Sequence, residues 1–524
     1  MFQQKTVLSS LFLFCFNFLL LAQSGPLDKI DIDDLKRNLT FIASDKLQGR
    51  KLGTEVDGLG ICADFLAENA KRIGLKPAVE NYFQPVNILG TKPQQNNFIE
   101  IQNKKGKLVF RTNSLVALNS SSESSEFETD QLVFVGFGDE ITDDIEEKVV
   151  VLAQGNAESF LKDEFYRWDR RLEQNKIADI SEKKPKAILI VANPNDKENK
   201  TYNQINTWFK RERFSLASEA PNNALSVVLT KADFADKLLG AKGSFKKYLT
   251  EVATGEKSEL PDIRKTLKVK IEKQTNFFES KNVIGVVEGS DPILKNEYVV
   301  FMAHYDHLGI GKDGDVYNGA DDNGSGTVAL LEVAEAFMSL DKKPKRSIVF
   351  LWVTCEELGH FGSGFYCDHP VFPLEKTVAA INLDMVGRVY NGPQDDVWKD
   401  SPKKVKDFDG LYTLTNDVWP ELANISAAKC KELGLVPDSS LPKNPFLRAS
   451  DHYNFHKSGV PILNYATGYH ADYHKVGDEV SKINFEKIKR VADLCFLVGL
   501  EVANKNHIEF LKEQNVKNEV GTDL

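Results

Sequence analysis

The chain has 524 residues, of which 42% are hydrophobic and 27% are charged, and its formal net charge is −10. This composition is typical of a soluble globular protein with about two to four domains. The negative charge argues against nucleic-acid binding as the main task. The six cysteines are widely spaced and form no C-x-x-C motif, which excludes a disulfide scaffold and a zinc-thiolate cluster.

The first element is an apolar run over residues 7–22 (VLSSLFLFCFNFLLLA), preceded by the single charge of Lys5 and followed by the polar stretch QSGPLDK. The run is shorter than the roughly 20 residues of a membrane-spanning helix, and it has the pattern of a secretory signal. We therefore predict a cleaved signal peptide over residues 1–22 and a secreted or periplasmic protein, with an uncleaved anchor as the alternative. No later segment is long and apolar enough to suggest stable membrane insertion.

Residues 30–77 have the pattern of helix and loop. Apolar residues recur at helical spacing in DGLGICADFLAENAKRIGL (57–75), where Gly74 is the expected stop. Residues 97–267 instead contain short apolar runs between polar linkers, and the polar run 119–128 is predicted to be a mobile loop. The strands expected in this part are residues 131–138, 148–155, 186–193 and 225–230.

From residue 281 onward, predicted strands and helices alternate. The expected strands are 282–289, 297–307, 346–354, 378–387 and 461–466, and the expected helices are 326–340, 422–433 and 483–503. Alternation of this kind, with strands that are apolar on both faces, predicts an α/β fold with a largely parallel sheet covered by helices. Ligands in such folds bind outside the carboxyl ends of the strands.

Acidic residues and histidines interrupt the predicted strands at those carboxyl ends. His304 and Asp306 are two residues apart, so on an extended chain they face the same way and could supply a metal ligand and its orienting partner. Asp321 and Asp322 precede a helix and could equally be helix caps. The other interruptions are Glu356, Glu357, Asp384, His470, Asp472, Tyr473 and His474. Together they form a nitrogen and oxygen donor set that suits Zn²⁺, with Mn²⁺ or Co²⁺ as substitutes.

Several other catalytic and binding chemistries are excluded because the chain lacks their sequence motifs. The chain contains no G-x-S-x-G nucleophile elbow, no H-E-x-x-H, no phosphate-binding G-x-x-x-x-G-K-[ST] and no G-x-G-x-x-G after a strand.

Five motifs, AHYDHLG, GADDNGSG, CEELGHFGS, NLDMVGR and DYHKVGDE, occur in this order. They resemble the zinc peptidase family of co-catalytic di-zinc aminopeptidases, whose relatives include glutamate carboxypeptidase-type peptidases, glutaminyl cyclases and the transferrin receptor ectodomain. SDKLQGRKLGTE (44–55) resembles the N-terminal signature of that family, and the strand-rich insert resembles a protease-associated domain. The resemblance covers nearly all of the mature chain.

The resemblance implies a zinc-exopeptidase fold of the phosphorylase/hydrolase-like type, with a mostly parallel mixed sheet flanked by helices. The catalytic domain would be discontinuous (23–96 and 268–524), with a β-rich insert domain over 97–267.

The resemblance also implies a role for each motif residue. Two zinc ions would be bridged by Asp322, which would precede a cis peptide bond to Asn323. His304 and Asp384 would hold one ion, and Glu357 and His474 would hold the other. Asp306 would orient His304, Glu356 would be the general base, and Tyr473 would stabilise the oxyanion. His307 and His452 are candidates for positions beside the ligands, whereas His360, His456 and His470 are expected on the surface or in loops.

These roles imply an exported metal-dependent exopeptidase, in the first place an aminopeptidase acting on peptide substrates. A carboxypeptidase or dipeptidase of the same fold is an alternative, for which Arg388 and Arg448 are the candidates to bind a C-terminal carboxylate. A single-zinc glutaminyl cyclase and a non-catalytic receptor-like homologue are further alternatives. The sequence leaves the oligomeric state open.

Overall fold

The computed structural model describes residues 25–118, 124–139, 141, 144–162, 168–219, 225–256, 265–389, 408–439 and 446–510. The predicted signal peptide and residues 119–123 of the predicted loop lie outside these ranges. Among the described residues, no helix combines the length and the apolar character that a bilayer span requires.

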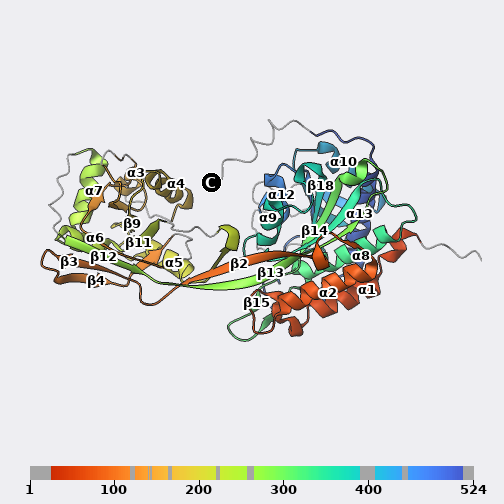
Figure 1. Cartoon of the computed structure of the whole chain (residues 1–524), viewed down its shortest axis with the longest axis horizontal. Helices are drawn as coiled ribbons and strands as arrows, with labels where there is room; N and C mark the ends of the chain where they lie inside the picture. Colours follow the sequence, from red (N-terminus) through yellow and green to blue (C-terminus); the bar gives the residue numbers. More distant parts are fainter. Residues whose placement is uncertain are drawn as a thin grey trace, which may run out of the picture.

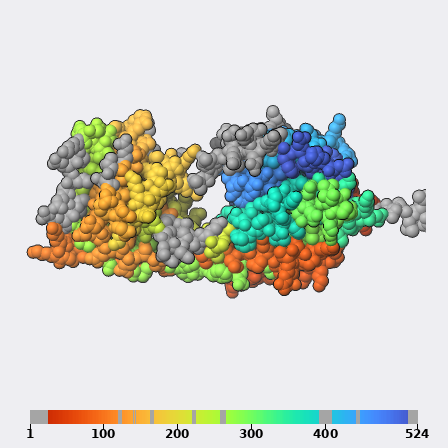
Figure 2. All heavy atoms as spheres, turned by 45° about the horizontal axis from the view of Figure 1, so that its top comes forward, coloured from red at the N-terminus to blue at the C-terminus, as the bar shows by residue number. Residues whose placement is uncertain are grey.

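The chain folds into two lobes that are joined by a ribbon of two long antiparallel strands, β2 (Phe83–Pro93) and β13 (Lys273–Val287) (Figure 1). The larger lobe contains both the first and the last described helices, which are red and blue in Figure 2. The smaller lobe is built from the chain between the two ribbon strands. The predicted insert 97–267 has nearly the same bounds as this lobe, although β10 (Arg213–Leu216) pairs with β2 in the sheet of the larger lobe.

The larger lobe is organised around a mixed ten-stranded sheet, which confirms the predicted α/β class. Its strands lie in the order β10-β2-β13-β17-β14-β18-β21-β19-β20, and β1 (Lys76–Pro77) pairs with β13. The central strands β14, β17, β18 and β21 are parallel to one another. The remaining bounds are β14 (Tyr298–His304), β17 (Ser347–Val353), β18 (Thr377–Leu383), β19 (Gly410–Thr415), β20 (Val436–Asp438) and β21 (Ile462–Ala466).

Helices cover both faces of this sheet, as the apolar strands predict. Alternate side chains of β17 enter two different cores: Phe350 and Trp352 pack on one face, and Leu351 and Val353 on the other. The helices of the first face are α1 (Ile32–Ile42), α2 (Gly58–Ile73), α8 (Gly326–Met338), α10 (Pro420–Glu432) and α13 (Phe485–Asn504). Those of the second face are α9 (Phe361–Asp368) and α12 (His452–Lys457).

The smaller lobe packs a mostly parallel five-stranded sheet against an antiparallel four-stranded sheet. The first contains β5 (Leu115–Ala117), β11 (Ser226–Thr230), β9 (Ala187–Val191), β8 (Val149–Ala153) and β7 (Leu132–Phe134), in that order. The second contains β4 (Leu108–Thr112), β3 (Phe98–Asn103), β12 (Lys265–Ile271) and β6 (Ser125–Thr129). Its helices are α3 (Ala157–Leu161), α4 (Arg170–Ser181), α5 (Lys200–Phe209), α6 (Ala232–Leu239) and α7 (Ser244–Thr254).

The prediction of a loop over residues 119–128 is wrong for residues 125–128. Ser125–Thr129 form β6, which pairs with β12. Phe127 packs against the core of the lobe, while Glu126 and Glu128 on either side are exposed. The alternation of one apolar residue between charged ones is that of a half-buried strand, and the preceding serines obscured it.

A buried arginine ties the N-terminal segment to the loops above the large sheet. Arg50 is fully buried, and its guanidinium donates to the carbonyl oxygens of Ile42, Tyr305, Asn318 and Gly319 at 2.6–2.9 Å. Burial lowers the pKa of Arg50, and the negative charges of the nearby Asp306 and Asp322 oppose this shift. Since a charge in the interior must be paired or hydrogen-bonded, Arg50 fixes the loop after β14 and the turn before α8 at one position.

We predict that Arg50→Met lowers the free energy of unfolding by at least about 3 kcal/mol, because four buried carbonyl groups lose their donor. The measurement is urea unfolding of both proteins. Arg72→Met is the matched control, since Arg72 is half exposed and pairs with Glu335 at the surface. It should cost less than about 1 kcal/mol. Equal losses in the two variants would contradict the assigned role.

Candidate metal centre

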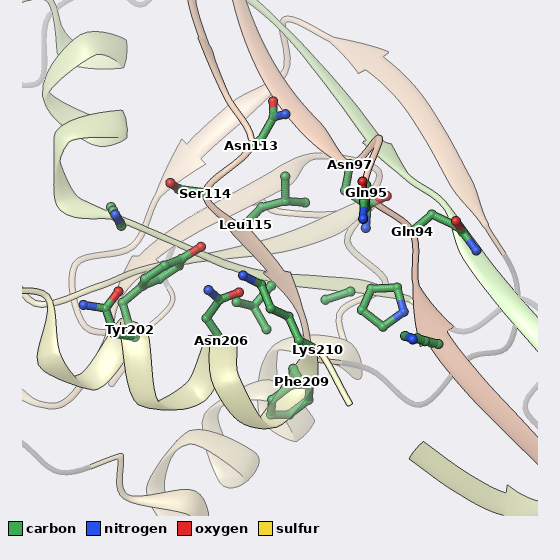
Figure 3. A pocket seen from close by; sticks show the side chains of 16 residues that line it. Gln94, Gln95, Asn97, Asn113, Ser114, Leu115, Tyr202, Asn206, Phe209 and Lys210 are labelled. Atoms are coloured by element: carbon green, nitrogen blue, oxygen red, sulfur yellow. The ribbon is translucent and has the colours of Figure 1, made fainter. Parts of the chain in front are cut away.

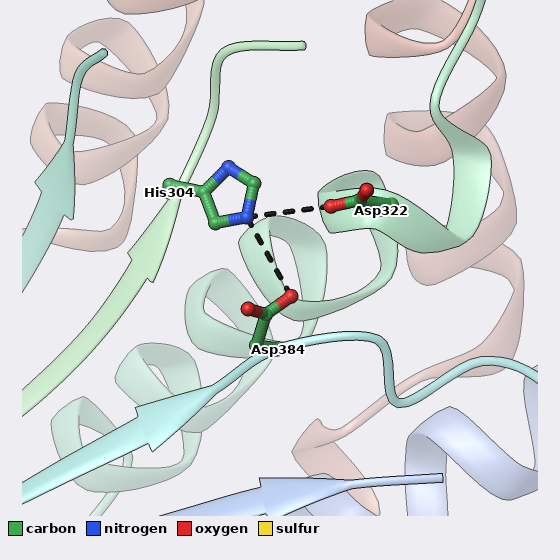
Figure 4. A group of neighbouring side chains, drawn as sticks. All are labelled: His304, Asp322 and Asp384. Carbon is green, nitrogen blue, oxygen red and sulfur yellow. Dashed lines mark ion pairs between the residues drawn. The ribbon is translucent and has the colours of Figure 1, made fainter. Parts of the chain in front are cut away.

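The candidate site lies where the parallel strands of the large sheet end. His304 is the last residue of β14, Asp384 follows the last residue of β18, and Asp322 lies in the turn Ala320–Ser325 before α8. Figure 4 shows these three side chains pointing toward one another from three separate elements. Nε2 of His304 is 3.4 Å from Oδ1 of Asp322 and 3.5 Å from Oδ1 of Asp384. Side chains far apart in the sequence therefore converge on one point.

Asp322 faces a second histidine through its other oxygen. Oδ2 of Asp322 is 3.1 Å from Nε2 of His474, which is 3.2 Å from Oε2 of Glu357. Nδ1 of His307 is 2.9 Å from Oε1 of Glu357 and 3.8 Å from Oδ2 of Asp322. The carboxylate of Asp322 thus separates two donor groups. Of the five residues expected as ligands, His304, Asp322 and Asp384 form the first group, and Asp322 and Glu357 form the second group together with His307. His474, the fifth, contacts Asp322 and Glu357 of the second group.

The donor atoms of this cluster fit a divalent cation. Oδ2 of Asp322 and Oδ1 of Asp384 are buried and form no hydrogen bond within the described part of the chain. Burial would raise the pKa of Asp322, but contacts with His304 and His474 hold it well below its usual range. Burial opposes the charged form of His474, yet Asp322 and Glu357 raise its pKa to about 10. The same two carboxylates that favour a positive charge on His474 would also favour a bound cation.

A third acidic group, Asp34, Glu332 and Glu335, lies between α1 and α8. Its two outer carboxylates are already paired, Asp34 with Arg37 and Glu335 with Arg72. The cluster around Asp322 is the better candidate because histidines and carboxylates converge there.

Glu356 lies beside the first donor group but is held differently from Glu357. Its Oε2 is 3.9 Å from Nε2 of His304, and its Oε1 is 3.0 Å from Nε2 of His360. Burial raises the pKa of Glu356 well above its ordinary value against the charge of His304, and Glu357 and Asp451 raise it further. A carboxyl group of raised pKa, close to the donors but outside both groups, is suited to moving a proton.

Asp306 holds the backbone of the two glutamates. Its Oδ1 accepts the N–H of Glu356 at 2.9 Å, and its Oδ2 accepts the N–H of Glu357 at 3.2 Å. Oδ1 is also 3.6 Å from Nδ1 of His304, beyond direct hydrogen-bond distance. The carboxylate predicted to orient the histidine is therefore bonded mainly to the glutamate turn.

Asp478 performs the same task for the turn that carries Asp322. Its carboxylate accepts the backbone N–H groups of Asp321 and Asp322 at 3.0–3.1 Å. Gly387 N–H donates to Oδ1 of Asp321, which joins this turn to the loop after Asp384. The predicted cis peptide bond between Asp322 and Asn323 is present.

Tyr473 lies beside the second donor group. Its ring stacks on that of His474 with centroids 3.8 Å apart, and the ring of Tyr469 meets it edge-on. Burial raises the pKa of Tyr473 above its ordinary value, and the charge of Asp322 adds to this shift. The hydroxyl therefore keeps its proton and can act as a hydrogen-bond donor.

Of the three histidines expected on the surface or in loops, His360 and His470 lie in loops, whereas His456 lies in α12. His456 and His470 are buried, and His360 is only 21% exposed and contacts Glu356. His470 Nε2 is 3.2 Å from Oδ2 of Asp321, so it supports the turn of Asp322. His452 is also buried, and it contacts Asn382 and the carbonyl oxygen of Phe446. The burial of these histidines results from tertiary packing, and a single polar residue in a predicted loop gives no indication of such packing.

Sequence reasoning missed two acids, Asp451 and Asp478. Asp451 is fully buried, and burial raises its pKa to about 6 against the charges of His304 and His360. Asp451 follows Ser450 at the start of α12, and Asp478 follows a glycine in a loop, so each resembled a helix cap or a turn residue. Asp478 is itself the seventh residue of the motif DYHKVGDE, and this was the available signal.

A mixed sheet with this cluster at the ends of its parallel strands defines a hydrolase-like α/β lobe with a candidate metal centre. The sequence model of peptidase family M28 matches residues 282–498, which lie in the larger lobe. The resemblance stated from the motifs is thereby confirmed.

Individual relatives are similar to part of the chain. Aminopeptidase YwaD of Bacillus subtilis (strain 168) is 30% identical over 236 residues, which cover 43% of this chain and 45% of that protein. Leucine aminopeptidase 2 of Trichophyton equinum is 29% identical, with 40% of this chain and 42% of that protein covered. The chain thus spans less than half the length of these curated relatives. The solved aminopeptidase from Aneurinibacillus sp. strain AM-1 has a TM-score of 0.51 at 18% identity, with 93% and 97% of the chains covered, which shows a shared fold.

We predict that Asp306→Ala speeds amide hydrogen exchange at Glu356 and Glu357 by about tenfold or more, because both N–H groups lose their acceptor. Hydrogen exchange read by mass spectrometry on peptides covering residues 355–361 checks this. Asp306→Asn keeps one acceptor oxygen and should have an intermediate effect. Unchanged exchange in the alanine variant would show that the carboxylate does not hold this turn.

Proposed function

We propose that this protein is an exported metal-dependent exopeptidase, an aminopeptidase that removes N-terminal residues from peptides with two zinc ions at its active site. The observation that carries the proposal is the position of Asp322, whose two carboxylate oxygens face His304 and His474 in separate donor groups. The match to the M28 family supports a peptidase, and the names of the relatives support an aminopeptidase. The apolar run over residues 7–22 supports export.

The residues present would hold the two ions as follows. Asp322 would contact both, His304 and Asp384 would complete one site, and Glu357 and His474 would complete the other. Nitrogen and oxygen donors of this kind suit Zn²⁺, and Mn²⁺ or Co²⁺ could replace it. When bound, the metal supplies Lewis acidity, which polarises a carbonyl group and lowers the pKa of water toward 7.

Two side chains outside the proposed ligand set carry out the remaining steps: one transfers the proton, and the other stabilises the negative charge that develops. Glu356 accepts a proton from the attacking water and passes it to the leaving amine, a role that requires a carboxylate outside both donor groups. Its side chain contacts His360, and its backbone N–H donates to the carboxylate of Asp306; together these contacts keep Glu356 at one position. The Tyr473 hydroxyl donates to the tetrahedral oxygen as negative charge develops there.

The charge of the site favours recognition of an N-terminus over a C-terminus. The cluster collects carboxylates, which attract a free α-ammonium group. Arg388, a candidate for binding a C-terminal carboxylate, is 2.8 Å from Asp472 and 3.8 Å from Asp478. Because its guanidinium is already bonded to acidic side chains, it is poorly placed to bind a substrate carboxylate.

The function is tested with a panel of aminoacyl anilides, the same compounds with acetylated amino groups, and short peptides. We expect release of N-terminal residues only from free amines, loss of turnover with 1,10-phenanthroline, and recovery on addition of Zn²⁺. Product identity is read by mass spectrometry. Cleavage of the acetylated substrates, or release of C-terminal residues, would overturn the aminopeptidase assignment.

The adjacent glutamates provide a matched pair of variants. Glu356→Gln should retain two zinc ions per chain while kcat falls by about 10²–10⁴-fold, because only the proton acceptor is lost. Glu357→Gln should lower the zinc content, because it removes a ligand. Metal content is measured by atomic emission alongside turnover. A wild-type enzyme that is fully active with one zinc per chain would rule out the two-metal proposal.

A further inference from the structure

A cavity of about 630 Å³ lies in the smaller lobe, away from the candidate metal centre. It is lined by the end of β2, the following residues 94–97, the segment 113–117 and one side of α5 (Figure 3). Figure 3 shows Tyr202 and Asn206 of α5, and Lys210 just after it, on one side, with Asn113 and Gln95 across from them. The cavity is thus enclosed by elements from distant parts of the sequence.

The lining of this cavity is cationic in a chain whose net charge is −10. Its sixteen residues all belong to the described part of the chain, and three of them are lysines while none is acidic. No ion pair joins Lys92, Lys210 or Lys231 to another described residue. Lys231 lies 5.2 Å from the ring centre of Tyr202. Positive charge is therefore available to a ligand carrying carboxylates.

One wall of the cavity is the edge of a sheet. β5 is the first strand of the five-stranded sheet, and its residues pair with β11 on one side only among the described strands. All three residues of β5 line the cavity, together with Asn113 and Ser114 just before it. An edge strand presents N–H and C=O groups that an extended peptide can pair with.

The remaining polar groups suit a peptide more than a simple anion. The side-chain amides of Gln95, Asn113 and Asn206 form no hydrogen bond to a described residue, and an amide can both donate to and accept from a peptide backbone. Phe209, Pro93 and Leu115 supply apolar surface between these amides and the lysines. The cavity therefore combines main-chain, apolar and cationic contacts.

We propose that this cavity binds an acidic peptide segment in extended form, paired with the edge of β5, with its carboxylates against Lys92, Lys210 and Lys231. The peptide's backbone contacts the strand edge and the amides, and its Asp or Glu side chains contact the lysines. This inference does not rest on the proposed hydrolysis, since it concerns a different part of the molecule.

The test measures binding of a fluorescent hexapeptide of alternating Glu and Val, acetylated at its N-terminus so that it is not an aminopeptidase substrate. Fluorescence anisotropy with the full-length protein should show saturable binding that weakens with added salt. Lys92→Gln with Lys210→Gln should weaken binding about tenfold, which corresponds to about 1.4 kcal/mol. The control, Lys242→Gln with Lys246→Gln, makes the same charge change at exposed positions of the same lobe and should leave binding unchanged.

Two further peptides separate the contributions. A peptide with Lys in place of Glu should not bind, and N-methylation at alternate residues of the acidic peptide should weaken binding, because strand pairing needs the peptide N–H groups. Equal binding by the cavity and control variants would overturn the proposal. It would also be overturned if the N-methylated peptide bound as well as its parent, because charge alone would then account for the affinity. Since no readout uses turnover, failure here leaves the proposed aminopeptidase activity untouched, and the reverse also holds.

Discussion

The concentration of buried negative charge around Asp322 is the constraint on which the arrangement of the larger lobe depends. Asp322, Glu356, Glu357 and Asp384 all lie at the ends of parallel strands or beside them, and each of these carboxylates contacts a histidine within 3.5 Å. Isolated charges in a protein interior are costly, so each must face a cation or a hydrogen-bond donor. His304 and His474 face Asp322 and meet this requirement, and the same arrangement of donors suits a cation.

The loops that carry these acids are themselves held by buried charged side chains that belong to neither donor group. Arg50 donates to carbonyl oxygens before the Asp322 turn, Asp478 accepts N–H groups within that turn, and Asp306 accepts those of the glutamate turn. In each case, one charged side chain forms hydrogen bonds with several backbone groups that have no partner within a strand or helix. Because charge-assisted hydrogen bonds are strong and directional, irregular backbone is fixed here about as firmly as regular structure. The chain can therefore place donors precisely on loops.

The sequence predicted the central strands and the covering helices, because apolar periodicity is a local signal. Its ordered motifs also pointed to five residues that the fold brings together around Asp322. It did not predict β6, where serines masked an alternating pattern, nor the length of β13, whose pairing partner lies almost two hundred residues earlier. It also missed Asp451, since only folding brings that acid beside Glu356. Cys355, His360, Met385 and His474 adopt positive φ, a conformation that L-residues rarely favour, and no residue type marked them in advance. The unpredicted features are those that depend on contacts between distant segments.

The ribbon of β2 and β13 links the metal centre to the lysine-lined cavity through continuous hydrogen-bonded structure. At one end, Asn282 of β13 accepts the N–H of Thr354 and donates to the carbonyl oxygen of Gly362, on either side of the two glutamates. At the other end, Lys92 and Pro93 of β2 line the cavity. The register from Phe83 to Pro93 is unbroken, so no flexible linker separates the two ends. The glutamate turn and the lysine-lined cavity are therefore connected through one continuous pair of strands, whose hydrogen bonds satisfy the backbone between the two lobes.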